Sequence, residues 1–548
     1  MAFVQSVGFT LLSFALVISV VVFFHELGHL LVGKALGVKA LRFSIGFGPK
    51  LFGFKSQETE YRVSLLPLGG YVKFAGDNPY EEVAPEDRGR GFLEQPPWKK
   101  GLIAFAGPAA NFILAIVLYF VVFAAPHQDL AAKVGYVKPQ SPAAQASLRS
   151  GDRILAIDGT SVEGWSDLQE KIRGHLGQPL TMEIERAGRR LSLRVVPAVH
   201  EETNPIETVK HGRIGISAVP RAAEVTVIAP DSPAGRAGLR TFDKVAKLDG
   251  EPVANWELLQ EKLASRTDPL KLEVLRSEAV QAPGAVLWSN KPISLEVPAP
   301  AKVGEYGLEA SDLTLFVVQP GGAADEAGLQ RGDRVLAVNG QPALSWTDEV
   351  DGVIKSQGTQ PVQVTVRRDG KELTVAAKPH PKKERDETGV LQDVPDLGAS
   401  PDLNAFVEPE RIWVRYSLPD AARRAVTKNA VDVRAQAIGI VRIITGHISS
   451  RAIGGPLMIA DVARSAAESG WRALVATMGA ISVVLGLMNL IPVPVLDGFH
   501  VLTALIEGIR RRPLSIRFRE VANVVGIALL LTLMLYAIRN DAMRKWFE

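Results

Sequence analysis

The chain has 548 residues, several times the usual domain size of roughly 100 to 200 residues, so a single compact domain is excluded. Apolar residues make up 47% and charged residues 22%, a balance too hydrophobic for a disordered chain. The formal charge of +3 gives no indication of a nucleic-acid partner, and the sequence has no cysteine, which excludes disulfides, thiolate metal ligands and a cysteine nucleophile. Any metal ion must therefore bind to His, Asp or Glu.

The first predicted element is a transmembrane helix. Val7 to Phe24 form an eighteen-residue run without charge, about the length that spans a bilayer. A cleaved signal peptide is the rival interpretation, but no Lys or Arg precedes the run, and His25-Glu26 follows where a small-residue cleavage site would lie. We therefore expect a helix that stays in the membrane.

The sharpest motif, His25-Glu26-Leu27-Gly28-His29, closes this span. Residues four apart share a helix face, so His25 and His29 can bind one Zn²⁺ while Glu26 serves as general base. Zinc lowers the pKa of bound water to about 7, which suits peptide hydrolysis. The alternative is a group of interfacial polar residues without a metal, although three ionisable groups beside an apolar run are costly unless they serve a site.

Two segments punctuated by Gly and Pro, 43–49 and 61–72, predict short strands after the motif. They are expected to form a small membrane-associated sheet at the cytoplasmic end of the site. Gly69 and Gly70 in the second segment are candidate substrate-binding or helper residues, because an exposed strand edge can hold an unwound substrate by strand addition. A plain cytoplasmic hairpin is the alternative.

A second span is predicted at Leu102–Ala125, interrupted by Gly107-Pro108 and by the polar Asn111, a further candidate helper residue. The long segment after it repeats with a period of roughly 90 residues, and the copies show the same small-residue turn near Ser141, Ser232 and Gly322. Each copy predicts a strand, a short helix, a strand ending in an Asp-Gly or Asn-Gly turn, another helix and an alternating strand.

This repeated pattern resembles the PDZ domain in the form common in bacterial proteases, over roughly residues 130 to 380. The resemblance implies that an extended peptide is received at a sheet edge, often with its terminal carboxylate on backbone N–H groups. The segments 214–216 and 306–308 resemble the carboxylate loops preceding the second and third copies, or, if the strands are circularly permuted, the loop 214–216 serves the first copy. Spacers or size filters without a peptide ligand are the alternative.

A charged linker, Lys382–Glu387, is expected before a helical stretch that returns to the membrane. A third span is predicted at Ala473–Leu496 and a fourth at Val521–Ile538. The third is broken by Pro492 and Pro494 and is followed by Asp497. Irregular backbone at membrane depth needs protein or a water-filled cavity around it, so Asp497 is a candidate third metal ligand. A helix cap outside the membrane is the alternative for this carboxylate.

Basic residues predict the orientation of the spans. The loops between the first and second spans and between the third and fourth are rich in Lys and Arg, for example Arg510-Arg511-Arg512, and should be cytoplasmic. With an even number of spans, both termini and the long segment from about 126 to 471 then face the opposite side, which in a bacterium is the periplasm.

Taken together, these motifs closely resemble the site-2 protease family of intramembrane zinc metalloproteases, in the bacterial regulator of sigma-E protease type. The match includes the motif 25–29, Gly107-Pro108 with Asn111, the PDZ-like copies and the pattern from Asn489 to Gly498. Two features depart from it, since Gly498 is followed by Phe499-His500 instead of Gly-His, and three copies replace the usual one or two.

The resemblance implies a Zn²⁺ cofactor held by His25, His29 and Asp497, with Glu26 as general base and Asn489 as a polar helper near the substrate. It also implies transmembrane protein substrates, of the anti-sigma factor or remnant signal peptide class, and a multi-pass location in the bacterial inner membrane with periplasmic PDZ-like domains. Two rivals remain open. One is a membrane-anchored soluble-type zinc protease whose third ligand is Glu81, Glu82 or Glu94, and the other is a non-catalytic PDZ scaffold.

The predicted architecture is a polytopic α-helical membrane protein with about four transmembrane helices, a small membrane-associated β segment and tandem mixed α/β PDZ-like domains. The expected divisions follow the chain: 1–126 with the first two spans, 127–200, 201–300 and 301–381 for the PDZ-like copies, 382–470 for the linker and helical return, and 471–548 for the last two spans.

Overall fold

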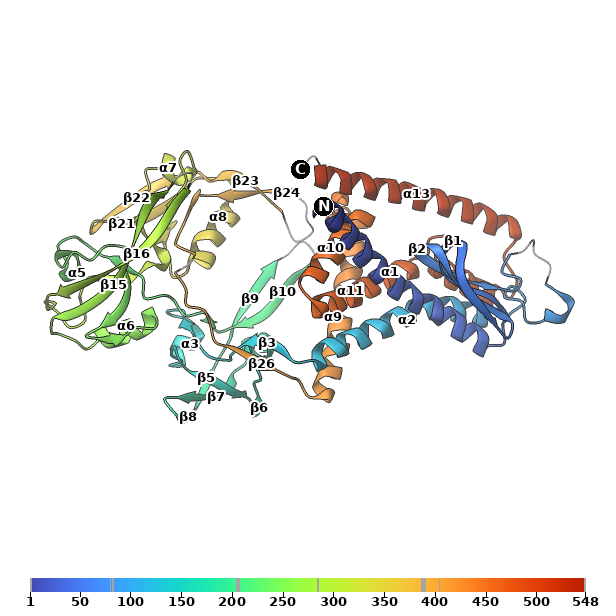
Figure 1. The fold of residues 1–548 in the computed structure, drawn as a ribbon, viewed down its shortest axis with the longest axis horizontal. Coiled ribbons are helices and arrows are strands. Elements are labelled where there is room, and N and C mark those ends of the chain that lie inside the picture. Colours follow the sequence, from blue (N-terminus) through green and yellow to red (C-terminus); the bar gives the residue numbers. More distant parts are fainter. Residues whose placement is uncertain are drawn as a thin grey trace.

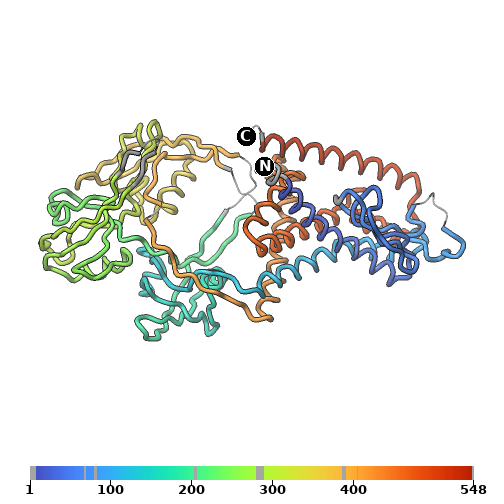
Figure 2. The backbone as a smooth tube through the Cα atoms, viewed as in Figure 1, coloured from blue at the N-terminus to red at the C-terminus, as the bar shows by residue number. Residues whose placement is uncertain are grey.

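The computed structural model describes residues 2–78, 80, 83–203, 207–282, 285–385, 391–403 and 405–546. Figure 1 shows two parts, a bundle of long helices and a group of smaller units built from strands and short helices. The chain leaves the bundle after α2 (Pro97–Ala124) and returns through α9 (Leu418–Ile444), as the tube in Figure 2 shows. The smaller units therefore form one continuous insertion between membrane-type helices.

Four helices among the described residues are long and apolar enough to cross a membrane: α1 (Ala2–Ala35), α2, α11 (Trp471–Leu490) and α13 (Ile516–Trp546). The sequence predicts the same number. The third helix is shorter than predicted, ending at Leu490 instead of Leu496, because Pro492 and Pro494 have no N–H to donate and disfavour helical backbone in the residues before them. The first is longer and contains the motif 25–29 within its last three turns.

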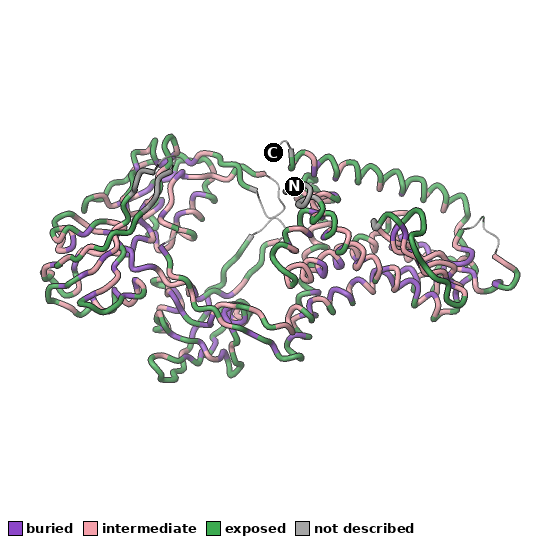
Figure 3. Tube along the Cα trace, viewed as in Figure 1, coloured by how far each residue is buried: buried purple, intermediate pink, exposed green. Residues whose placement is uncertain are grey.

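Helix α2 lies at the centre of the bundle, in contact with α1, α9, α11 and α12 (Asp497–Arg510). Buried apolar and aromatic side chains fill these contacts: Val17, Val21, Leu114, Ala115, Tyr119, Met478 and Val483. Helix α10 (Pro456–Glu468) packs against α1, α11 and α13. Helix α12 occupies a stretch predicted as a plain loop, and Figure 3 shows that α13 is exposed along most of its length.

Beside α1 lies one long antiparallel hairpin, β1 (Ala40–Ser56) and β2 (Thr59–Phe74). The predicted strands are shorter, because both observed strands bend and fold back: 42–45 pairs on one side with 70–73 and on the other with 60–63, and 52–56 pairs with 59–63. Phe43 and Phe74 are buried near the helices. The far half exposes large apolar side chains: Phe47, Leu51, Phe52, Phe54, Leu65 and Leu66. An exposed apolar patch of this kind marks a surface that contacts lipid or another chain.

Three units of one architecture follow between α2 and α9, each with a four-stranded antiparallel sheet and its own apolar core. The first contains β4 (Tyr136–Val137), α3 (Pro142–Gln145), β5 (Arg153–Ile157), β6 (Thr160–Ser161), α4 (Trp165–Arg173), β7 (Leu180–Arg186), β8 (Arg189–Val195) and β11 (Ile216–Ser217). The second contains β12 (Val225–Val227), α5 (Pro233–Arg236), β13 (Lys244–Leu248), β14 (Glu251–Pro252), α6 (Trp256–Leu263), β15 (Leu270–Ala282), β16 (Ala285–Val297) and β17 (Leu308–Ala310). The third contains β18 (Val317–Val318), α7 (Ala323–Glu326), β19 (Arg334–Val338), β20 (Gln341–Pro342), a π-helical turn (Trp346–Asp351), α8 (Gly352–Gln357), β21 (Val362–Arg368), β22 (Lys371–Ala377) and β25 (Ala399–Ser400).

The strand that completes each unit comes last in its sequence. In the first unit β11 pairs with β4, so that Ile216 lies opposite Val137. In the same way β17 pairs with β12, and β25 pairs with β18. The loops 214–216 and 306–308 therefore close the units before them, as the permuted alternative predicts for the first copy, and the expected divisions at 200, 300 and 381 leave each closing strand outside its unit. Sequence spacing does not reveal this, because strand pairing is a long-range contact.

Three further antiparallel strand pairs lie outside these sheets. Two are hairpins, β9 (Ala198–Thr203) with β10 (Thr208–Arg213) and β23 (His380–Arg385) with β24 (Leu391–Asp396), and the third pairs β3 (His127–Leu130) with β26 (Arg411–Val414) at the two ends of the insertion. Three short 3-10 turns lie at Pro85–Asp87, Ser311–Leu313 and Ser450–Ala452. The charged segment predicted as a linker thus belongs in part to β23. Arg424 of α9 pairs with Asp167 and Glu170 of α4, which joins the first unit to the bundle.

Candidate metal centre

The two histidines of the motif lie on one face of α1. Their Nε2 atoms are 3.2 Å apart, and both residues are buried, with 6% and 9% of their surface exposed for His25 and His29. Helical geometry brings about this approach, because residues four apart are neighbours on adjacent turns.

A carboxylate from the other end of the chain reaches the same point. Oδ2 of Asp497 lies 3.0 Å from Nε2 of His25 and 3.4 Å from Nε2 of His29. One ligand-type atom from each of the three residues lies within 4.8 Å of the others, the only such group of three in the part of the chain that the structure describes. Two imidazole nitrogens and one carboxylate oxygen are the donor set that catalytic zinc takes from a protein, so these residues fit Zn²⁺.

The turn between α11 and α12 places Asp497. Helix α11 stops at Leu490, the next six residues are not helical, and α12 begins at Asp497. Val495 has a φ of +83°, a strained conformation for a β-branched residue and one that tends to occur at functional sites. A Cβ on Gly498 would lie 2.3 Å from the carbonyl oxygen of Leu490, so only glycine fits after the aspartate.

Groups on α2 orient both imidazoles. Nδ1 of His29 lies 2.8 Å from the carbonyl oxygen of Ile103, which must accept its proton and so leaves Nε2 free to bind a metal. Nδ1 of His25 lies 3.2 Å from the side-chain amide of Asn111, a fully buried residue whose Oδ1 has no hydrogen-bond partner among the described residues. A half-turn of that amide brings Oδ1 to the His25 N–H and gives His25 the same tautomer.

Glycines let α1 and α2 approach closely at the site. A Cβ on Gly28 would lie 2.4 Å from the carbonyl oxygen of Ala106, and a Cβ on Gly107 would lie 2.2 Å from Nε2 of His29. Small residues at a crossing of membrane helices allow their backbones to touch. The sequence marks Gly107 only as an interruption of the second span, whereas the structure shows that it makes room for Nε2 of His29.

The predicted base lies between the histidines and the hairpin. Glu26 is half-buried, and the backbone of Val72 in β2 hydrogen-bonds to its carboxylate. A Cβ on Gly70 would lie 3.0 Å from Cγ of Glu26, whereas Gly69 faces the ring of Phe47. Strand β2 therefore runs beside Glu26, and Gly70 permits the close approach.

Of the other candidate residues within the described part of the chain, Asn489 lies beside the group of His25, His29 and Asp497, and Glu94 does not. The amide nitrogen of Asn489 lies 3.4 Å from Nε2 of His25, beside the donor group. Glu94 accepts the backbone N–H groups of Gly89 and Gly91 and is not part of the donor group, while Glu81 and Glu82 lie outside the described residues. The role of the Ile103 carbonyl cannot be predicted from the sequence, because every residue has a backbone oxygen and no residue type marks this one.

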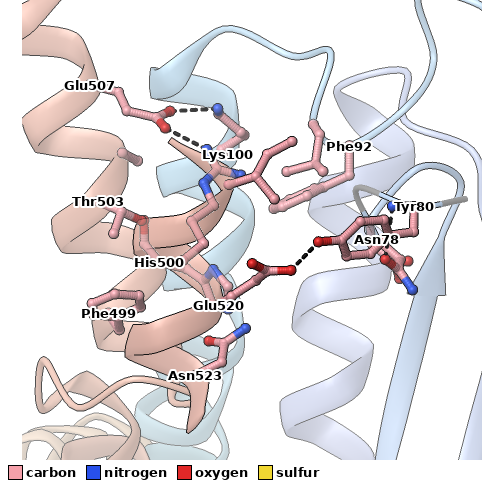
Figure 4. Close-up of a pocket in the computed structure, with 15 residues that line it drawn as sticks. Asn78, Tyr80, Phe92, Lys100, Phe499, His500, Thr503, Glu507, Glu520 and Asn523 are labelled. Carbon is pink, nitrogen blue, oxygen red and sulfur yellow. Dashed lines mark hydrogen bonds and ion pairs between the residues drawn. The ribbon is translucent and has the colours of Figure 1, made fainter. Parts of the chain in front are cut away.

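A cavity of about 360 Å³ lies next to the first turn of α12 and is lined by Phe499 and His500 (Figure 4). It extends between α2, α12, α13 and the segment 77–93, where Tyr80 hydrogen-bonds to Glu520 of α13. Space for solvent or peptide thus begins at Phe499, directly after Asp497 and Gly498.

Comparison with known proteins identifies the family. The profile described as peptidase family M50 matches residues 13–533. The chain is 29% identical over 543 residues to protease RseP of Yersinia pestis, covering 98% of this chain and 100% of the relative. It is 30% identical over 550 residues to “Putative zinc metalloprotease RSc1411” of Ralstonia nicotianae (98% of each chain) and 27% identical over 534 residues to a “Putative zinc metalloprotease” of Vibrio cholerae (97% and 98%). The chain therefore belongs to peptidase family M50, the site-2 protease family, and is a zinc-dependent metalloendopeptidase.

Proposed function

We propose that this protease cleaves single-span membrane proteins within or beside the bilayer, with His25, His29 and Asp497 as zinc ligands and Glu26 as general base. The observation that carries the proposal is that three ligand-type atoms meet at the ends of apolar helices. His25 and His29 lie in the last turns of α1, and Asp497 follows α11. A charge or unpaired polar group in such surroundings is costly unless it serves a site. Glu94, the rival ligand within the described residues, is engaged with local backbone instead.

The roles of the side chains follow from their positions. Zn²⁺, when bound, polarises a peptide carbonyl and makes water acidic enough to deprotonate near neutral pH. Glu26 can accept that proton and return it to the leaving amine, since it directly follows His25 on α1 and lies beside β2 at Gly70. Asn489 is close enough to the donor group to hydrogen-bond a substrate oxygen. Ile103 and Asn111 keep the imidazole rings in one orientation.

We infer that β2 presents the substrate. A transmembrane helix shields its peptide bonds with its own hydrogen bonds, so it must unwind before cleavage, and strand addition stabilises the extended form. Support comes from β2, which contacts α1 and runs past Glu26 at Gly70. The exposed apolar side chains of the hairpin support its insertion at the membrane surface.

The three repeated units are proposed to be periplasmic PDZ-like domains of an inner-membrane enzyme, spanning about 131–218, 222–310 and 314–400. They would select substrates by binding peptide C-termini or by excluding bulky chains. One contact favours exclusion. Lys138, whose backbone N–H donates to Gly215 in the loop expected to receive carboxylates, pairs through Nζ with Asp348 (2.8 Å) and Glu349 (2.5 Å) of the third unit. By the family resemblance, the substrates would be anti-sigma factors or remnant signal peptides.

The test is Glu26→Gln in the purified full-length protein, assayed on a single-span model substrate in detergent. Glutamine keeps the shape of glutamate but accepts no proton, so we expect cleavage to fall by roughly 10² to 10⁴-fold while the zinc content stays equal. Glu94→Gln is the matched control and should cleave at the wild-type rate. Equal cleavage by Glu26→Gln and wild type would reject the assigned role.

A further inference from the structure

A second buried carboxylate lies near the end of α12 and has no part in the proposed reaction. Only 3% of the Glu507 side chain is exposed, and its Oε2 lies 2.6 Å from Nζ of Lys100 in α2, itself 10% exposed. Its other oxygen accepts from the backbone N–H of Leu514, at 3.0 Å, and from Arg519 of α13. Figure 4 shows this group at the wall of the cavity, with Lys100 reaching across to Glu507.

The same helix begins with Asp497. Ten residues separate the two carboxylates, which corresponds to about 15 Å along a helix with a rise of 1.5 Å per residue. Between them α12 lies directly against α2, where a Cβ on Gly101 would be 3.3 Å from Cβ of Ala504. A displacement of α12 at Glu507 would therefore move Asp497 as well.

Helix α2 also sets the histidines. Lys100 precedes Ile103 by three residues, so the two lie on adjacent turns of one side of α2. Ile103 accepts the hydrogen bond that orients His29, at 2.8 Å. One helix thus bears the partner of Glu507 and the partner of a proposed zinc ligand.

We propose that Glu507 is a positioning residue for the metal: its ion pair with Lys100 fixes α12 against α2 so that Asp497 reaches His25 and His29. This inference rests on the proposed function of those three residues. Removing one partner of a buried ion pair leaves the other charge uncompensated, so the helices shift to rehydrate it. Groups that hold metal ligands in place typically change metal affinity by about 10 to 100-fold when they are altered, and Glu507 would act on Asp497 in this way through α12.

The first measurement is zinc affinity of the full-length protein in detergent, by competition with a chelator. Glu507→Gln should bind zinc roughly 10-fold more weakly or worse than wild type. Asp541→Asn is the matched control, because Asp541 is also a buried carboxylate of the bundle but accepts from the backbone of Gly455 and Leu457 at the start of α10. It should leave zinc affinity unchanged. An unchanged affinity for Glu507→Gln would overturn the proposal.

A mutant cycle separates positioning from general stability. If Glu507 acts through Asp497, adding Glu507→Gln to Asp497→Ala should weaken zinc binding no further, whereas a purely structural residue would give additive losses and refute the proposal. Lys100→Met with Glu507→Met removes the two most buried charges and leaves Arg519, whose side chain is 25% exposed, to solvent. It should recover zinc affinity to within about 3-fold of wild type, since an apolar pair replaces a buried ion pair well. The proposal would also be contradicted if the double variant bound zinc no more tightly than Glu507→Met alone. If Asp497→Ala alone binds zinc like wild type, the ligand assignment itself fails.

Discussion

Replacing Gly107 by alanine is the most direct test of how closely α1 and α2 must approach at the metal centre. The added methyl group would lie 2.2 Å from Nε2 of His29 and 2.8 Å from Cε1 of His25, whereas an ordinary contact begins near 3.4 Å. The imidazole or the helix must therefore move by about 1.2 Å, the difference between 3.4 Å and 2.2 Å. The ring cannot turn freely because its Nδ1 is held by the carbonyl of Ile103.

The expected result of Gly107→Ala is loss of function without loss of the helix. Alanine favours helical backbone over glycine by about 1 kcal/mol, so α2 itself should not be weakened. A displacement of about 1 Å at a catalytic group can cost roughly 10²-fold in rate, and we expect a fall of that order in kcat/KM, with zinc affinity reduced at least about 10-fold.

The assay combines cleavage of a single-span substrate with chelator competition for zinc. Gly8→Ala in α1 is the control, because a Cβ at Gly8 meets nothing within 4 Å, and it should behave as wild type. A Gly107→Ala protein with wild-type zinc affinity and cleavage would refute the inferred crossing of α1 and α2.

Three further predictions address the hairpin, the units and pH. In Gly70→Ala the added Cβ would lie 2.8 Å from the carbonyl oxygen of Ser44 and 3.0 Å from Cγ of Glu26. The variant should have a roughly 10-fold lower kcat at unchanged zinc affinity, because it displaces the strand and not the proposed ligands. A parallel fall in zinc affinity would contradict this. The second variant lacks 131–410 and joins Leu130 to Arg411, two residues that are already paired across β3 and β26. It should cleave substrates with large outward domains faster than wild type. An inactive variant that still binds zinc would show that the units belong to the catalytic machinery. Burial raises the pKa of Glu224, which accepts from Ser311, to about 7 from 4.5. The folded state therefore holds a proton that the unfolded state releases above pH 4.5, and about 3 kcal/mol of stability should be lost as pH rises from 4.5 through 7. Glu224→Gln should accordingly raise Tm relative to wild type more at pH 8 than at pH 5, and an equal difference at both would show that the carboxyl does not titrate there.

The sequence predicts the candidate metal ligands better than the residues that hold them in place. His25 and His29 need only helical spacing to meet, and Pro492 and Pro494 mark the break that precedes Asp497. The carbonyl of Ile103 and the pairing of Lys100 with Glu507 could not be predicted, because they depend on which sides of α2 and α12 touch, and local patterns do not encode this contact.

The fold shows the same division between local and distant signals. The apolar runs predict four membrane-type helices, and the repeated turns predict three small units. The end of α11 is local as well, yet the sequence predicts it six residues later because the apolar composition continues through the prolines. The sequence does not predict helix α12, because this helix follows directly and its apolar residues cover one side only. The predicted divisions leave the closing strands β11, β17 and β25 outside their units because pairing joins residues roughly 80 apart.

The donor residues of the metal centre come from opposite ends of the chain, which has a consequence for its synthesis. Ribosomes add roughly 5 to 20 residues per second, so the histidines precede the aspartate by roughly half a minute or more. During that interval the emerging chain lies in the membrane with His25 and His29 but without Asp497. An interrupted translation product that stops before Asp497 therefore carries the motif helix without the proposed third donor, and on that ligand assignment proteolytic activity is expected only in chains that the ribosome has nearly finished.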